Sequence, residues 1–147
     1  MRLVNSCLIA LAVMGVSQAQ ESGSADKDRL QGLWQAIKGE AHGHETTKAE
    51  LQVFQIRIKD NVMTFLPDNR SSTFELDASK KPKTIDFIPN DGPAKGMKVP
   101  AGIYSLNGDE LILCLNNGDA PGRPSEFKTR PGGDLRLLVL QRVKARE

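Results

Sequence analysis

The only two histidines of the chain, His42 and His44, are one residue apart, and Glu45 follows directly. Two imidazoles and a carboxylate at this spacing could reach one zinc or copper ion from an extended loop, because both metals accept nitrogen and oxygen ligands. A complete centre also takes a third or fourth ligand from elsewhere in the chain, and the sequence identifies none. A solvated, glycine-containing loop is the alternative, and we predict no resident metal and no other cofactor.

Other arrangements of catalytic residues are missing from the sequence. A serine nucleophile works with a base and an orienting acid, but no serine lies in a Gly-x-Ser-x-Gly turn. Asp86 and Glu126 could act as a carboxylate pair, yet the sequence does not bring them to working distance. A surface carboxylate beside Lys83 is the alternative for Asp86. The glycine-rich stretch over residues 91–96 lacks the spacing of a phosphate-binding loop. We therefore predict that the chain is not an enzyme.

The first residues have the pattern of an export signal. Arg2 gives a basic start, an apolar run follows over residues 8–16, and the small residues Ser17 and Ala19 precede a cut after Ala19. The apolar run is too short to cross a bilayer as a stable helix, and an N-terminal membrane anchor is the alternative. We predict a signal peptide at 1–19 and a mature chain that is periplasmic or secreted, extracytoplasmic in either case, with no membrane span.

The composition predicts one globular domain and excludes several partners. A chain of 147 residues has room for a single core. Its formal net charge of +2 gives no reason to expect nucleic acid as a partner. Beyond the predicted signal peptide Cys114 is the only cysteine, which excludes an intramolecular disulfide. It lies in an apolar run and is predicted to be a small buried hydrophobe; a reactive thiol is the alternative.

Short strands account for most of the remaining sequence. Apolar residues recur with the period of two that is typical of strands, as at Leu111, Leu113 and Leu115. The Asn107-Gly108 pair between two apolar runs predicts a tight hairpin, because both residues tolerate positive φ. No segment longer than a turn or two has helical period. The predicted strands are 33–40, 51–58, 62–66, 72–76, 84–88, 102–106, 110–115, 126–129 and 135–141.

The order of these strands predicts the fold class. Strands joined in sequence by short turns are typical of an antiparallel barrel or sandwich, and closure of a barrel removes exposed edges. We predict an all-β fold, an up-and-down barrel of about eight to nine short strands over residues 30–142. A flexible lead-in over 20–29 precedes the barrel, and a polar tail over 143–147 follows it.

The start of the first strand carries a resemblance to known barrels. Gly32-Leu33-Trp34 resembles the Gly-x-Trp start of lipocalin-like barrels. The resemblance implies that Trp34 plugs the closed end and that a basic residue near the last strand packs over it. Arg136 and Arg142 are the candidates, since an arginine over an indole is favourable.

A longer resemblance covers residues 30–142. The segments 76–87, 90–93, 102–111 and 123–127 are similar, in this order, to a small exported lipocalin-like domain family of planctomycete-type bacteria. This resemblance implies a lipocalin-like barrel and export, and it implies no activity. The two histidines at His42 and His44 depart from the family pattern.

The barrel interior is the remaining candidate site. Barrels of about eight strands either fill with side chains or hold one small ligand. We predict a non-catalytic binding module for a small apolar molecule; the alternative is a protein-interaction or structural domain with a filled barrel, whose loops 89–100 and 116–125 meet a protein or cell-surface partner. The predicted ligand-binding residues are Trp34, Phe54, Met63, Phe65, Phe87, Tyr104 and Phe127.

Overall fold

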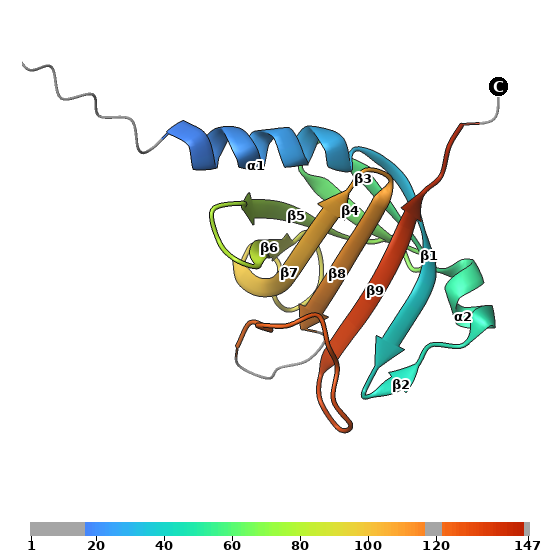
Figure 1. Cartoon of the computed structure of the whole chain (residues 1–147). Coiled ribbons are helices and arrows are strands. Elements are labelled where there is room, and N and C mark those ends of the chain that lie inside the picture. The colour runs from blue at the N-terminus through green and yellow to red at the C-terminus, as the bar shows by residue number, and fades with distance from the viewer. Residues whose placement is uncertain (1–16, 117–121, 146–147) are drawn as a thin grey trace, which may run out of the picture.

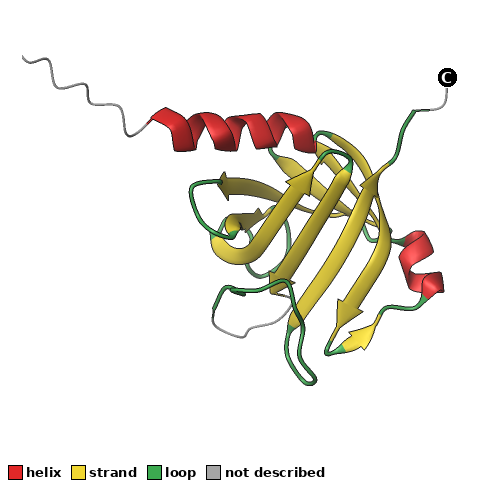
Figure 2. Ribbon diagram, viewed as in Figure 1, coloured by secondary structure: helices red, strands yellow, loops and turns green. Residues whose placement is uncertain are grey.

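A computed structural model of the chain describes residues 17–116 and 122–145, in which it contains nine strands and two helices (Figures 1 and 2). From β3 onward each strand pairs antiparallel with the next, and β1 pairs with both β3 and β9. The strands thus form a closed antiparallel barrel of eight, with β2 as one extra strand, which confirms the predicted fold class. The elements are α1 (Ser17–Leu30), β1 (Gly32–Ala41), β2 (His44–Glu45), α2 (Lys48–Val53), β3 (Gln55–Lys59), β4 (Val62–Leu66), β5 (Arg70–Asp77), β6 (Lys83–Pro89), β7 (Val99–Asn107), β8 (Glu110–Asn116) and β9 (Leu135–Arg142).

The core lies inside the barrel, because alternate residues of each strand point to the same face. Fifteen buried hydrophobic residues form one cluster, among them Trp34, Met63, Phe74 and Leu140. Two further buried residues, Ile103 and Cys114, stand opposite each other on β7 and β8 but do not belong to that cluster. Their strand neighbours Tyr104 and Leu113 do belong to it, so Ile103 and Cys114 face outward.

Cys114 is buried, as the sequence predicted, and it lies on the outer face of the barrel. Its thiol lies 3.9 Å from the carbonyl oxygen of Lys128, in the segment that joins β8 to β9. Burial raises the pKa of the thiol, and the Glu40 carboxylate adds to the rise, while the contact with Lys128 opposes it. The thiol therefore stays protonated and weakly nucleophilic at neutral pH.

The helix α1 lies across one end of the barrel (Figure 1), and the fully buried Trp34 contacts its last residue there. The indole N–H donates to the Leu30 carbonyl at 2.8 Å, and the Arg142 guanidinium carbon lies 4.3 Å from the centroid of the indole ring. Arg142 also donates to the carbonyls of Arg29 and Gln31. The last carbonyls of a helix have no partner within it, and here the first and last barrel strands provide their donors. Of the two arginines considered for the position over the indole, Arg142 occupies it.

The buried carboxylate of Asp26 attaches α1 to the barrel strands at this end. Asp26 is 3% exposed, and it accepts hydrogen bonds from Lys83 Nζ at 2.7 Å and from the Tyr104 hydroxyl at 2.8 Å. Burial raises the pKa of Tyr104 above its ordinary value, and the hydrogen bond to Asp26 raises it further. Asp26 and Leu30 are one helical turn apart, and both are buried against the barrel.

Four details differ from the sequence prediction. Residues 20–29 are helical within α1, where a flexible lead-in was expected. The predicted strand 51–58 begins as α2, which starts with reciprocal hydrogen bonds between Thr47 and Glu50, a capping box. Residues 126–129 form no strand. Asp86 pairs with Arg123 and Lys98, whereas Lys83 is engaged by Asp26.

Candidate functional site

The open end of the barrel, opposite α1, contains a cavity of about 360 Å³. Its rim is formed by the turn between β4 and β5 (residues 67–69), the loop between β6 and β7 (residues 90–98) and the inner faces of β8 and β9. The turn is fixed locally, since the Asp68 carboxylate accepts from the Arg70 backbone N–H and Asn69 adopts a φ of 58°. This volume is at the lower end of the roughly 300–1,000 Å³ that small-molecule sites occupy.

Three phenylalanines form one wall of this cavity. The ring centroids of Phe54 and Phe65 are 6.4 Å apart, and those of Phe65 and Phe87 are 5.9 Å apart with the rings edge to face. All three are half-buried and pack against the core cluster from the open end. Because the cavity is continuous with the core on one side, an apolar molecule entering it would extend the core rather than displace it.

Two arginines line the cavity: Arg70 is exposed at its rim, and Arg136 faces into it from β9. Leu138 and Leu140 on this strand are buried in the core cluster, and Arg136 is on the same face, two residues nearer the open end. Its guanidinium carbon lies 5.6 Å from the centroid of the Phe54 ring. Arg136 was a candidate for the position over Trp34, and the structure places it over Phe54 instead.

The structure brings together three of the seven predicted ligand-binding residues: Phe54, Phe65 and Phe87 line the cavity. Trp34, Met63 and Tyr104 are buried in the core, in the part of the barrel nearer α1, and do not line it. Phe127 is half-buried in the segment that joins β8 to β9 and also lies outside the lining. The sequence prediction treated the interior as one site, whereas buried side chains pack the half nearer α1 and the cavity lies in the open half.

Several lining residues were not predicted as ligand-binding residues. Arg136 could have been found from the alternation of Arg136, Leu138 and Leu140 along one face of the last strand. Ser72 and Leu115 line the cavity because they are inward positions near the open ends of β5 and β8. Only the closed barrel shows that these inward positions face one another.

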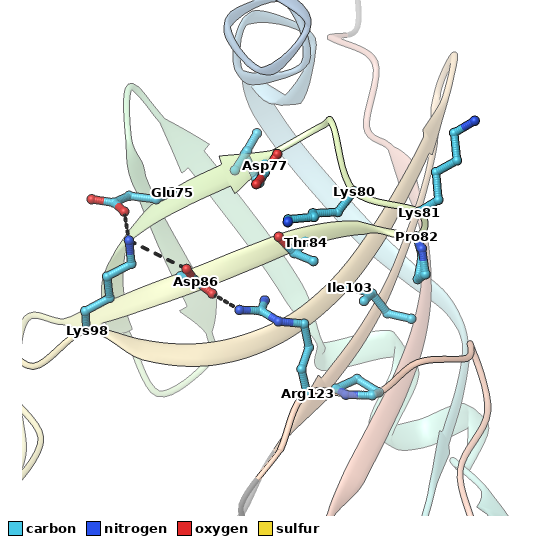
Figure 3. A pocket seen from close by; sticks show the side chains of 12 residues that line it. Glu75, Asp77, Lys80, Lys81, Pro82, Thr84, Asp86, Lys98, Ile103 and Arg123 are labelled. Atoms are coloured by element: carbon cyan, nitrogen blue, oxygen red, sulfur yellow. Dashed lines mark hydrogen bonds and ion pairs between the residues drawn. The ribbon is translucent and has the colours of Figure 1, made fainter. Parts of the chain in front are cut away.

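A larger groove of about 610 Å³ lies on the outside of β5, β6 and β7 (Figure 3). Four of its charged groups are matched with one another: Lys98 bridges Glu75 and Asp86, and the Arg123 guanidinium also binds Asp86. Arg123 donates as well to the carbonyls of Ile85 and Gly102, each at 2.9 Å.

The local strand pairing explains why Arg123 occupies this groove. A bulge shifts the register between β6 and β7 at Ile85, and Pro100 on β7 lacks an N–H for the ladder. Arg123 supplies donors where the ladder is interrupted. We therefore interpret the groove as part of the support of the bulge, and not as the candidate site.

The histidine loop shows no complete metal site in the described part of the chain. His42 adopts a φ of 53°, and its Nδ1 donates to the Gly133 carbonyl at 2.6 Å. His44 is exposed on β2. Among the described residues, no group of three or more His, Cys, Asp or Glu side chains is placed to hold a metal ion.

No protein-family model, curated protein or solved structure matches the chain. The resemblance to exported lipocalin-like domains therefore stays a prediction from the sequence. In residues 17–116 and 122–145, no helix has both the length and the apolar character needed to cross a membrane.

Proposed function

We propose that the chain is a non-catalytic, extracytoplasmic binding module that takes one small, mainly apolar molecule at the open end of its barrel. The observation that carries this proposal is the cavity of about 360 Å³ with its wall of three phenylalanines. Burial of apolar ligand surface against these rings supplies about 25 cal/mol per Å². The fixed barrel reduces the ordering cost of binding, since the strands that carry the rings are already paired.

Export is part of the proposal and rests on the basic start, the apolar run over 8–16 and the small residues before Gln20. A cut after Ala19 falls within α1, whereas Asp26 and Leu30, which hold α1 to the barrel, come after the cut. When the chain is expressed in a bacterium, we expect to recover it from the periplasm with the molecular mass of a chain that begins at Gln20. Full-length protein in the cytoplasm would contradict export.

Titration with N-phenyl-1-naphthylamine, a neutral apolar dye, tests the binding function. Wild-type protein is expected to bind one dye per chain with saturable enhancement of its fluorescence. In Ser72→Phe the new ring fills the cavity from an inward position of β5, and we expect dye binding to weaken at least about tenfold. Thr64→Phe is the matched control, because Thr64 precedes the inward Phe65 on β4 and does not line the cavity.

The outcomes separate the two functions that the sequence left open. If Ser72→Phe loses dye binding and Thr64→Phe keeps it, the result supports the cavity as the binding site. Absence of saturable binding, or equal binding by both variants, overturns the proposal. Those results would favour the alternative of a filled barrel that meets a partner through loops 89–100 and 116–125.

A further inference from the structure

Arg136 occupies a costly position for a cation. It faces the inside of the barrel at its open end and is half-buried, and Leu138 and Leu140 continue the same face into the core. A charged group removed from water is destabilising unless an opposite charge or hydrogen bonds compensate it. The position therefore raises the question of what balances its charge.

The described part of the chain provides little compensation. Its guanidinium packs on the Phe54 ring, but no described carboxylate lies within ion-pair distance, and no described group accepts a hydrogen bond from it. The Glu50 carboxylate is close enough to interact electrostatically, but it is hydrogen-bonded to Thr47, and that bond is the main cause of its lowered pKa.

The other two arginines anchored on the barrel differ in this respect. Arg123 and Arg142 each bind one carboxylate and two backbone carbonyls. Arg136 alone of these three has its donors unused, and it is the one that lines the cavity. A guanidinium stacked on a ring still presents its N–H edge, with a geometry that matches a carboxylate.

We propose that Arg136 binds the anionic head of the ligand, and that the ligand is a small monoanion, one carboxylate on a short apolar or aromatic tail. This inference rests on the proposed binding function and specifies its ligand class. The tail lies along Phe65 and Phe87, and the size of the cavity limits its length. The two rim carboxylates of Asp68 and Asp91 outnumber the one rim arginine, Arg70, and so disfavour a second negative charge at the far end of the ligand.

Calorimetric titration of the full chain with octanoate, 1-octanol and octylammonium tests the inference, because the three probes share a tail and differ in the head. We expect wild-type protein to bind octanoate at least about tenfold more tightly than 1-octanol, and octylammonium most weakly, since hydrogen bonds between charged groups exceed neutral ones by about this factor.

Variants at Arg136 locate the effect. Arg136→Gln is expected to remove the preference for octanoate while 1-octanol binding changes less than about threefold, and Arg136→Lys is expected to restore part of the preference. Arg57→Gln is the matched control, because Arg57 is an exposed arginine on the outer face of β3. It is expected to leave all three affinities unchanged.

The outcomes distinguish this inference from the function on which it rests. If 1-octanol binds as tightly as octanoate, or if Arg136→Gln keeps the preference, the barrel is a binding module but Arg136 is not its anion site. If none of the three probes binds, the binding function itself is wrong. A thermal melt of each variant shows whether a loss of binding reflects loss of the fold.

Discussion

Replacement of Arg142 by methionine is predicted to open the closed end of the barrel. The side chain is 24% exposed, its guanidinium stacks on Trp34, and it donates to the carbonyls of Arg29 and Gln31 at the end of α1. Methionine keeps much of the length and apolar character of the arginine stem, so that Arg142→Met removes mainly the charge and its hydrogen bonds.

The magnitude follows from these contacts. Hydrogen bonds that involve a charged group contribute about 1.5–3 kcal/mol each, and a cation over an indole contributes about 0.5–2 kcal/mol. The ion pair with Asp109 adds little, because the Asp109 side chain is 47% exposed. These terms are not additive, and we expect the free energy of unfolding to fall by about 3–5 kcal/mol.

Urea denaturation followed by tryptophan fluorescence measures this change, since Trp34 is the only tryptophan of the chain and is fully buried. Arg57→Met is the control and is expected to change stability by less than about 0.5 kcal/mol, as exposed substitutions do. Limited trypsinolysis provides a local readout: cleavage after the exposed Lys27 and Arg29 should accelerate in Arg142→Met under native conditions. A loss below about 1 kcal/mol with unchanged cleavage would refute the role of Arg142 as the link between α1 and the barrel.

Two further predictions concern the interior. Because the folded chain holds the Tyr104 proton more tightly than the unfolded chain does, the free energy of unfolding should decrease above pH 10, by up to about 1.4 kcal/mol per pH unit. Tyr104→Phe should remove that slope. Phenolate absorbance reports only Tyr104, because it is the one tyrosine of the chain, and it should appear together with unfolding. Phenolate absorbance from the folded protein at pH 10 would contradict the buried hydrogen bond to Asp26. Gly102→Ala should lower stability by more than about 3 kcal/mol, because an added Cβ would lie 2.0 Å from the Cys114 backbone oxygen. A thermal melt equal to that of Gly133→Ala, where the nearest atom is at 3.3 Å, would contradict this.

The strands were largely predictable because their signal is local. Alternation of inward apolar and outward polar residues located β1, β4 and β8 to within a residue or two, and Asn107-Gly108 marked the turn between β7 and β8. The segment 51–58 was misassigned because the alternation of Phe54, Ile56 and Ile58 was extended backward. The capping-box pattern Thr47-x-x-Glu50 in front of it is a helix signal that the sequence did contain.

The helix α1 was not predictable from its own residues. It lacks an apolar stripe, and isolated helices of this length are marginal in water. The residues that hold it lie far away in the sequence: Lys83 and Tyr104 bind Asp26, and Arg142 binds the Arg29 carbonyl near the end of the helix. The burial of Asp26 depends on the closed barrel, so that no local pattern reports it.

The candidate site shows the same division between local and long-range information. The phenylalanines were predicted because aromatic residues on strands are candidates for any barrel interior. Their contact depends on the order in which β3, β4, β5 and β6 pair, which brings Phe54, Phe65 and Phe87 into one row. The exclusion of Trp34 and Tyr104 from the site depends on where side chains fill the barrel, which single-residue patterns do not encode.

The two ends of the barrel use the same residue type in opposite ways, and this contrast supports the open end as the functional one. At the closed end the guanidinium of Arg142 is satisfied by a carboxylate, two carbonyls and an indole, so that nothing is left for a ligand. At the open end Arg136 contacts one phenyl ring and borders empty volume. A cation serving only the fold would gain stability from a nearby acceptor, and in the described chain no acceptor lies within hydrogen-bond or ion-pair distance of Arg136. An anionic ligand head would offset the cost of burying Arg136, and the octanoate titration tests whether such a head binds there.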